Sequence, residues 1–267
     1  MTQEKIDIVV LWVDGSDPEF IREKQMVARK DGGSDSYIDS DMRYRDYGTF
    51  NNWFRMIENH APWVNKVFLI TNGQKPEWLN LAYPKLRWVT HKEFIPQEYL
   101  PTFNSAAIEL NLHRIEDLSE NYLYFNDDMY MIRDCKPSDF YKNGLPKLLA
   151  VYDAIVPWAP ITKTYLNNIE LIYRHFPNKA AMKASPWKFL NYRYGLRLFK
   201  NLLLLPWGPT GYVNPHLPVP MKKNTLAHLW EIEFETLDKT SRNHFRDYKF
   251  DVNQYICQNW QIESNQF

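Results

Sequence analysis

Four short apolar segments, each ended by polar turn residues, constrain the fold of this chain most. Ile6 to Val13 (IDIVVLWV) is almost entirely apolar and rich in β-branched residues, which is typical of a buried strand. The segments 66–71, 86–90 and 122–125 have the same character. Helical periodicity appears between the strands, at 19–30, 50–57 and 105–118. We therefore expect an α/β fold in which helices cover both faces of a parallel-type sheet.

The remaining chain changes character after residue 140. We divide the whole chain into an α/β core at 1–140, a basic, aromatic and proline-rich insertion or lid at 141–223, and a helical tail at 224–267 that packs back on the core. Short helices are expected near 164–175 and 187–203. The polar stretch 31–41 (DGGSDSYIDSD) is expected to be a loop.

Charge and cysteine content exclude several classes of function. The chain has 32 basic and 32 acidic side chains, so it carries no signal for nucleic-acid binding. Residues 171–230, however, include nine Lys and Arg and no Asp or Glu, which favours phosphate, a charged glycan or a membrane surface as partner. Cys135 and Cys257 stand alone, which argues against a disulfide framework or a cysteine zinc site.

The first residues, MTQEKIDIVVLWVDG, lack the plan of a signal peptide, because charged residues lead straight into a strand-like run. The longest aliphatic run, Leu202 to Leu205, is far too short to cross a bilayer. We expect a cytoplasmic protein with peripheral contact at the inner face of the cell membrane. The motifs G-x-x-x-x-G-K-[ST], G-x-G-x-x-G and H-E-x-x-H are absent, which removes the usual support for P-loop kinases, ordinary Rossmann dehydrogenases and zincins.

Polar side chains follow the ends of the predicted strands, where parallel sheets bind ligands. Asp14 and Asp17 lie on the turn after the first strand, and either hold a metal or ribose or simply cap the turn. Asp127 and Asp128 follow the fourth strand, and their hard oxygen atoms suit Mg²⁺ or Mn²⁺ bridging a diphosphate. The alternative is a pair of solvated turn aspartates.

Four further residues at three places in the chain are candidates, each with an open alternative. Asn104 and Ser105 precede a helix and either cap it or bind phosphate. His216, set among prolines in the carboxylate-free segment, is a candidate general base or phosphate ligand, although an isolated histidine is more often structural. Arg246 is a candidate phosphoryl clamp or an ordinary surface residue.

Taken together, four blocks of sequence carry a resemblance. They are IDIVVLWVDGSDPEF at 6–20, a long block at 43–131 that includes LPTFNSAAIELNLHRIEDLSENYLYFNDDMYM, NPHLPVP at 214–220 and FRDYKFDVNQYICQNW at 245–260. The chain resembles the Stealth family, the bacterial capsule and cell-wall phosphotransferases related to the lysosomal-targeting N-acetylglucosamine-1-phosphotransferase. The first two blocks match densely, whereas the last two are shorter, and 141–213 matches no named pattern.

The resemblance implies a GT-A-like (Rossmann-like) nucleotide-sugar transferase fold, a divalent cation, Mg²⁺ or Mn²⁺, and a UDP-sugar-type donor. It implies a donor site made by Asp14, Gly15, Asp17, Arg43, Arg45, Asp46, Asn72, Asn104 and Ser105. It also implies metal or catalytic carboxylates at Asp127 and Asp128, with a catalytic histidine and arginine at His216 and Arg246.

The expected reaction transfers a hexose-1-phosphate to a hydroxyl of a glycan or lipid-linked oligosaccharide and releases UMP. Such chemistry depends on positioning and charge neutralisation. Three alternatives remain open: a metal-dependent GT-A glycosyltransferase that releases UDP, a metal-dependent phosphohydrolase, and a glycan-binding module without activity.

Overall fold

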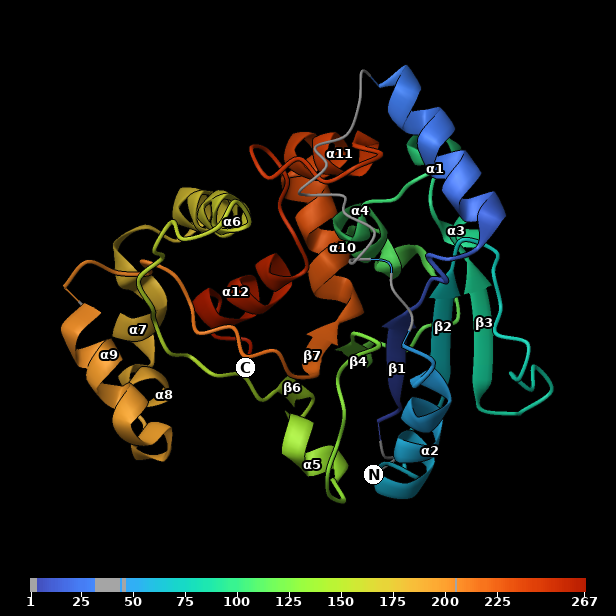
Figure 1. The fold of residues 1–267 in the computed structure, drawn as a ribbon. Coiled ribbons are helices and arrows are strands. Elements are labelled where there is room, and N and C mark those ends of the chain that lie inside the picture. Colours follow the sequence, from blue (N-terminus) through green and yellow to red (C-terminus); the bar gives the residue numbers. More distant parts are fainter. Residues whose placement is uncertain (1–3, 32–43, 45–46, 205) are drawn as a thin grey trace.

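Five strands form the central sheet, in the order β3-β2-β1-β4-β7 (Figure 1). The computed structural model describes residues 4–31, 44, 47–204 and 206–267. The strands are β1 (Ile6–Leu11), β2 (Val67–Thr71), β3 (Leu86–Thr90), β4 (Asn121–Phe125) and β7 (Val219–Lys222). The first four are parallel, and β7 runs antiparallel to β4. A short hairpin, β5 (Tyr141–Lys142) and β6 (Leu145–Pro146), stands apart from this sheet.

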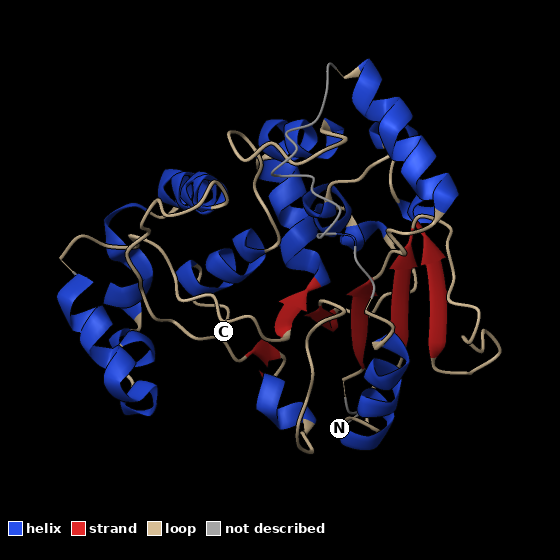
Figure 2. Ribbon diagram, in the orientation of Figure 1, coloured by secondary structure: helices blue, strands red, loops and turns tan. Residues whose placement is uncertain are grey.

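Helices surround the sheet and build a peripheral lobe (Figure 2). Those before the lobe are α1 (Pro18–Lys30), α2 (Phe50–His60), α3 (His91–Phe94), α4 (Ser105–Leu110) and α5 (Pro137–Phe140). The next group comprises α6 (Thr162–His175), α7 (Ala180–Ala184), α8 (Pro186–Phe189) and α9 (Leu198–Leu204). The tail contains α10 (Lys223–Ile232), α11 (Phe234–Arg242) and α12 (Tyr255–Glu263). Short 3₁₀ turns lie at Gln97–Tyr99, Leu112–Arg114, Pro177–Lys179 and Tyr192–Arg197.

The two faces of the sheet pack against different helices. Ile8 and Val10 of β1 belong to a core with Trp53 and Ile57 of α2, whereas Val9 belongs to a second core with α4, α10 and α12. Successive side chains of a strand point to opposite faces, so a strand covered on both sides must be apolar throughout. This explains the nearly continuous apolar runs from which β1, β2 and β4 are predicted. The mostly parallel α/β architecture confirms the expected GT-A-like, Rossmann-type fold class.

Two details of the sequence-based prediction are wrong. The helix expected at 105–118 ends at Leu110, because the side-chain amide of Asn111 donates to the carbonyl of Ala107 and to Ser241 Oγ, and a 3₁₀ turn follows. The predicted inward residues Ile108, Leu112 and Ile115 are nevertheless buried.

The antiparallel strand β7 was not expected, because Pro218 and Pro220 argue against a strand. Pro220 pairs with Leu123 of β4. It is tolerated because β7 is the edge strand of the sheet, where a missing N–H group on the outer side breaks no ladder.

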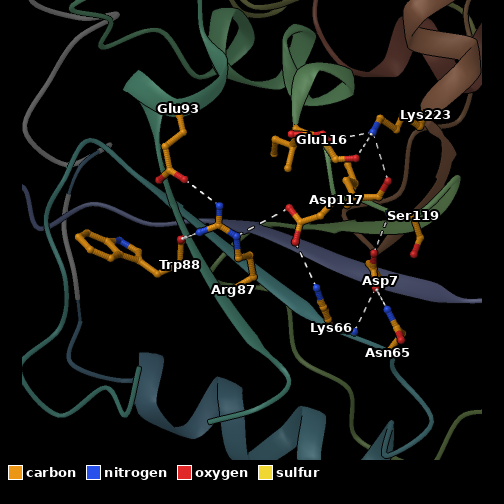
Figure 3. Close-up of polar contacts among 12 residues, drawn as sticks. Asp7, Asn65, Lys66, Arg87, Trp88, Glu93, Glu116, Asp117, Ser119 and Lys223 are labelled. Carbon is orange, nitrogen blue, oxygen red and sulfur yellow. Dashed lines mark hydrogen bonds and ion pairs between the residues drawn. The ribbon is translucent and has the colours of Figure 1, made fainter. Parts of the chain in front are cut away.

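A buried carboxylate, that of Asp7, fixes the loops at the amino-terminal edge of the sheet (Figure 3). Asp7 Oδ1 accepts hydrogen bonds from the amide of Asn65 and the backbone N–H of Lys66, and Oδ2 accepts one from the backbone N–H of Ser119. These bonds tie the loops that precede β2 and β4 to β1. They satisfy a charge that would otherwise be costly to bury.

The peripheral lobe has its own small core. Tyr152, Ile169, Phe189 and Tyr212 pack together there with Ile262 of α12. Helices α7, α8 and α9 lie beyond α12, on the side of the molecule away from β3 (Figure 1). Within the described ranges, none of the helices is long and apolar enough to span a membrane.

Candidate functional site

A cleft of about 470 Å³ lies at the carboxyl ends of β1, β2 and β4. The chain passes from β1 to β2 and β3 on one side and then returns to β4 on the other side of β1. Loops that leave β1 and β4 therefore diverge and open a crevice, as at other switch points of doubly wound sheets. The cleft is lined by a subset of the residues predicted from the sequence: Asn72, Asn104, Ser105, Asp127, Asp128, His216 and Arg246.

A histidine and a carboxylate meet at the mouth of this cleft. His216 Nε2 lies 2.9 Å from Asp128 Oδ1, and both side chains are more than half exposed. A neutral histidine in this contact donates from Nε2, which leaves Nδ1 as the proton acceptor. An oriented histidine with a proton acceptor left over, in a side chain open to solvent, has the geometry that a general base requires.

Asp127 and Asp128 provide hard oxygen donors beside this histidine. Among the residues that the structure describes, no three or more His, Cys, Asp or Glu side chains gather in a way that could hold a metal ion. Mg²⁺, however, usually takes one or two carboxylates and completes its shell with substrate phosphates and water. The two aspartates fit a cation that arrives with a diphosphate, and they do not form a closed metal site of their own.

Arg246 reaches the cleft from the loop between α11 and α12. Its Nη2 donates to Ser105 Oγ at 3.0 Å, at the first residue of α4. Its Nη1 is buried and has no hydrogen-bond partner among the described residues. An unpaired guanidinium nitrogen in a polar cleft is suited to an anionic ligand, because a buried charged donor is costly to leave unpaired.

Glu109 is a cleft residue that the sequence did not indicate. It is buried on α4, where Tyr124 donates a hydrogen bond of 2.7 Å to Oε1. Burial raises the pKa of this carboxyl to about 7, although Tyr124 and the nearby charge of Arg246 act in the opposite direction. One feature of the sequence could have indicated Glu109: it is the only acid in the otherwise apolar helix segment SAAIEL at 105–110.

A second buried acid, Asp251, joins the tail to the start of α4. Its Oδ2 accepts from Asn104 Nδ2 at 2.9 Å and from the backbone N–H of Asp247 at 2.8 Å, while Oδ1 accepts from Asn243. Burial raises the pKa of Asp251 to about 6. Asn104 also caps α4, because its Oδ1 accepts from the backbone N–H of Ala106. Asn104 therefore holds the cleft in shape with both polar atoms of its side chain.

The polar residues of the turn after β1 make local hydrogen bonds and do not line the cleft. Asp14 Oδ1 accepts two hydrogen bonds from Ser16, and Asp17 caps α1 through the backbone N–H of Phe20. Gly15 lines a separate small pocket with Tyr44, whose carbonyl oxygen would lie 2.2 Å from a Cβ at this position. None of the three lines the main cleft. Their role in donor binding stays a prediction, and the predicted donor residues Arg43, Arg45 and Asp46 lie outside the described residues.

Two family descriptions match this chain. Stealth protein CR1, conserved region 1, matches residues 4–32, and Stealth protein CR2, conserved region 2, matches residues 43–148. The capsular polysaccharide phosphotransferase eps5J of Streptococcus thermophilus is 60% identical over 198 residues, which cover 74% of this chain and 83% of that protein. The chain belongs to the Stealth family.

Other relatives match over nearly the whole chain. The capsular polysaccharide phosphotransferase WcwK of Streptococcus pneumoniae is 41% identical over 98% of this chain and 79% of its own length. The exopolysaccharide phosphotransferase cps2G of Lactiplantibacillus plantarum is 38% identical over 98% of this chain and 77% of its own length. The second of the two Stealth regions ends at residue 148, so His216 and Arg246 lie outside both regions. The folded chain brings these two residues to the cleft.

Proposed function

We propose that this protein transfers a hexose-1-phosphate from a UDP-sugar-type donor to a hydroxyl of a glycan acceptor in capsular or exopolysaccharide synthesis. UMP is the leaving group, and the product is a phosphodiester. One observation carries the proposal: an oriented histidine, two carboxylates and a partly unpaired arginine line the same cleft at a sheet switch point. The phosphotransferase names of the relatives support the same class of reaction.

In the proposed reaction, the acceptor oxygen forms a bond to the sugar-bearing phosphorus while the bond from that phosphorus to the bridging oxygen breaks. Nδ1 of His216 takes the proton of the attacking hydroxyl. The Nε2–H group of the same ring keeps its hydrogen bond to Asp128. Arg246 holds the phosphoryl oxygens through its unpaired Nη1. The anomeric carbon takes no part, so its configuration is retained.

A divalent cation, Mg²⁺ or Mn²⁺, would be held by Asp127 and Asp128 and would neutralise charge on the diphosphate. The chain's own residues supply the rest. Ser105 fixes Arg246 through its hydroxyl, and Asp251 fixes the start of α4 through Asn104. Such positioning is the main requirement of phosphoryl transfer, since the protein has little covalent chemistry to perform.

A donor panel with an acceptor oligosaccharide tests this function. UDP-glucose, UDP-galactose and their N-acetylamino counterparts are incubated with Mg²⁺, Mn²⁺ or a chelator, and products are identified by mass spectrometry. We expect UMP and a phosphodiester in equal amounts, with metal only. Release of UDP would instead identify a conventional glycosyltransferase, and UMP released equally fast without acceptor would identify a phosphohydrolase.

We further propose that the protein works on the cytoplasmic face of the cell membrane, docked through helix α9. Asn201, fully buried on α9, binds the backbone of Tyr152, Ala150 and Phe189. On the opposite side of the helix, Phe199 and Leu203 are therefore held outward, exposed by 61% and 71%.

The α9 surface, as we define it, joins these side chains to their exposed neighbours: Tyr192, Arg193, Leu196, Arg197, Phe199, Leu202 and Leu203. Exposed apolar groups interleaved with arginines, in a segment without any carboxylate, match the chemistry of an anionic lipid surface. Lys188 is not part of this surface, because its ammonium group donates to the carbonyls of Asn265 and Phe267.

A further inference from the structure

A second cavity, of about 210 Å³, lies beside the main cleft between α6 and the segment 153–158. Tyr165 of α6 lines both spaces. Asn214, which lines the second cavity, precedes His216 by only two residues. The cavity therefore adjoins the cleft on the side of the proposed base.

The wall between the two spaces is held by a reciprocal hydrogen-bonded pair. Asn168 Nδ2 donates to Asn253 Oδ1 at 2.7 Å, and the backbone N–H of Asn253 donates to Asn168 Oδ1 at 3.2 Å. Asn168 lines the second cavity and Asn253 lines the cleft. A ligand in one space thus has a fixed position relative to the other.

The lining of the second cavity has no Lys or Arg among the described residues. Its single ionisable acid, Asp153, is paired with Lys200 at 2.8 Å. The lining thus offers a phosphate or nucleotide no cationic side chain, and the nearby ammonium of Lys200 is paired with Asp153, in contrast to Arg246 in the main cleft. The charge pattern favours a neutral ligand.

The polar groups that remain are amides and hydroxyls beside aromatic rings. Asn259 is 2% exposed, and its Oδ1 has no hydrogen-bond partner among the described residues. A buried acceptor of this kind calls for a donor from a ligand or an ordered water. Trp158, at the rim, is 78% exposed and offers an indole face. Amide groups and an exposed indole suit the hydroxyls and C–H faces of a sugar ring.

We infer that this second cavity binds a neutral sugar unit of the acceptor glycan, next to the unit whose hydroxyl reaches His216 in the cleft. The inference rests on the proposed function, which supplies the reaction, and adds where the acceptor lies. The acceptor hydroxyl loses its proton to His216 and forms a bond to the sugar-bearing phosphorus, while the bond to the bridging oxygen breaks and UMP leaves, so the step needs no further reactant.

Saturation-transfer NMR with simple sugars tests the cavity directly. The probes are methyl β-glucoside, methyl β-galactoside, N-acetylglucosamine, N-acetylgalactosamine and lactose. The variants are Trp158→Ala and Asn259→Leu. The matched control is Trp207→Ala, because Trp207 is 68% exposed, similar to Trp158 at 78%, but lines neither space. We expect at least one sugar to bind the unaltered protein and to lose about ten-fold in affinity in both cavity variants, with no change in the control.

The inference is overturned if no probe sugar binds, or if binding is the same in Trp158→Ala and Asn259→Leu as in the unaltered protein. The same variants separate this result from the fate of the proposed function. If the protein forms no phosphodiester but sugars bind and respond to Trp158→Ala, the reaction is wrong and the cavity stands. If it forms phosphodiester with an unchanged acceptor KM in Trp158→Ala, the reaction stands and the cavity is wrong.

Discussion

Nε2 of His216 lies 2.9 Å from Oδ1 of Asp128, although 88 residues separate them in the sequence. The antiparallel pairing of β7 with β4 accounts for this contact. Tyr124 lies opposite Val219, so the residues that follow Tyr124 and those that precede Val219 extend beyond the same edge of the sheet. Strand β7, which was not expected because of its prolines, is thus the element that brings His216 to Asp128.

Loss of His216 should reduce catalysis and leave the fold intact. We expect His216→Ala to lower kcat for phosphodiester formation by about 10²–10⁴-fold, the usual contribution of a positioned base. Donor binding should change little, because the substitution removes no group assigned to the diphosphate. Steady-state kinetics with acceptor, together with a thermal melt, make the measurement.

A second histidine–aspartate pair supplies the control for this experiment. His60 Nδ1 lies 2.8 Å from Asp134 Oδ1, outside the cleft. His60→Ala should keep the activity of the unaltered protein. Equal losses in His60→Ala and His216→Ala would show that the effect comes from stability and not from a base.

Arg246 should act through its fork of donors as well as through its charge. We expect Arg246→Ala to lower kcat/KM for the donor by about 10²–10³-fold, a loss typical of removing one donor from developing charge. Arg246→Lys should recover only part of it, because an ammonium cannot bind Ser105 and a phosphoryl group in the same planar geometry. Arg242→Ala is the control, since Arg242 pairs with Asp238 away from the cleft. Full activity of Arg246→Lys would contradict a role for the planar guanidinium group, since charge alone would then be sufficient.

The pH dependence of stability should report on Glu109. Its pKa rises from 4.5 to about 7 on folding, because the carboxyl becomes buried. Between these values the unfolded chain has released the proton and the folded chain has kept it. The contribution of Glu109 to the free energy of unfolding is therefore fully present below pH 4.5. It is lost as the pH rises from 4.5 to about 7, by up to about 3 kcal/mol.

Urea unfolding across this pH range, with Glu109→Gln beside the unaltered protein, measures the effect. The glutamine does not titrate, so the free energy of unfolding of the unaltered protein should fall relative to the variant as the pH increases. Parallel curves for the two proteins would show that Glu109 has an ordinary pKa.

The α9 surface should bind anionic vesicles. We expect Arg193→Glu with Arg197→Glu to weaken co-sedimentation with phosphatidylglycerol vesicles by at least about ten-fold, since each basic residue near such a surface contributes about 1 kcal/mol. Phe199→Ser with Leu203→Ser should weaken it as well, through loss of apolar contact. The control is Arg55→Glu with Arg133→Glu. Both arginines are exposed, Arg55 on α2 and Arg133 in the loop between β4 and α5.

Two results would argue against membrane docking. One is unchanged sedimentation of the α9 variants. The other is equal binding of the unaltered protein to neutral phosphatidylcholine vesicles, because the arginines would then contribute nothing. A concentration-dependent dimer that dissociates in Phe199→Ser with Leu203→Ser would assign the surface to a second copy of the chain.

The sequence alone determined the α/β class and the positions of β1 to β4. For β1, β2 and β4 the reason is that a strand buried on both faces is apolar over nearly its whole length. It also determined that Asp127 and Asp128 follow a buried strand, where ligands bind in such sheets. These are local properties, because each depends on a few consecutive residues and the pattern they make.

Only the tertiary structure decided which distant residues meet. Glu109 and Asp251 look like ordinary acids in the sequence, and their raised pKa values come from neighbours that remove them from water. His216 reaches Asp128 because an edge strand pairs antiparallel with β4. Asp14 and Asp17 satisfy their own turn and helix in place of lining the cleft. Burial and long-range pairing depend on the packed chain as a whole, and no short stretch of sequence encodes them.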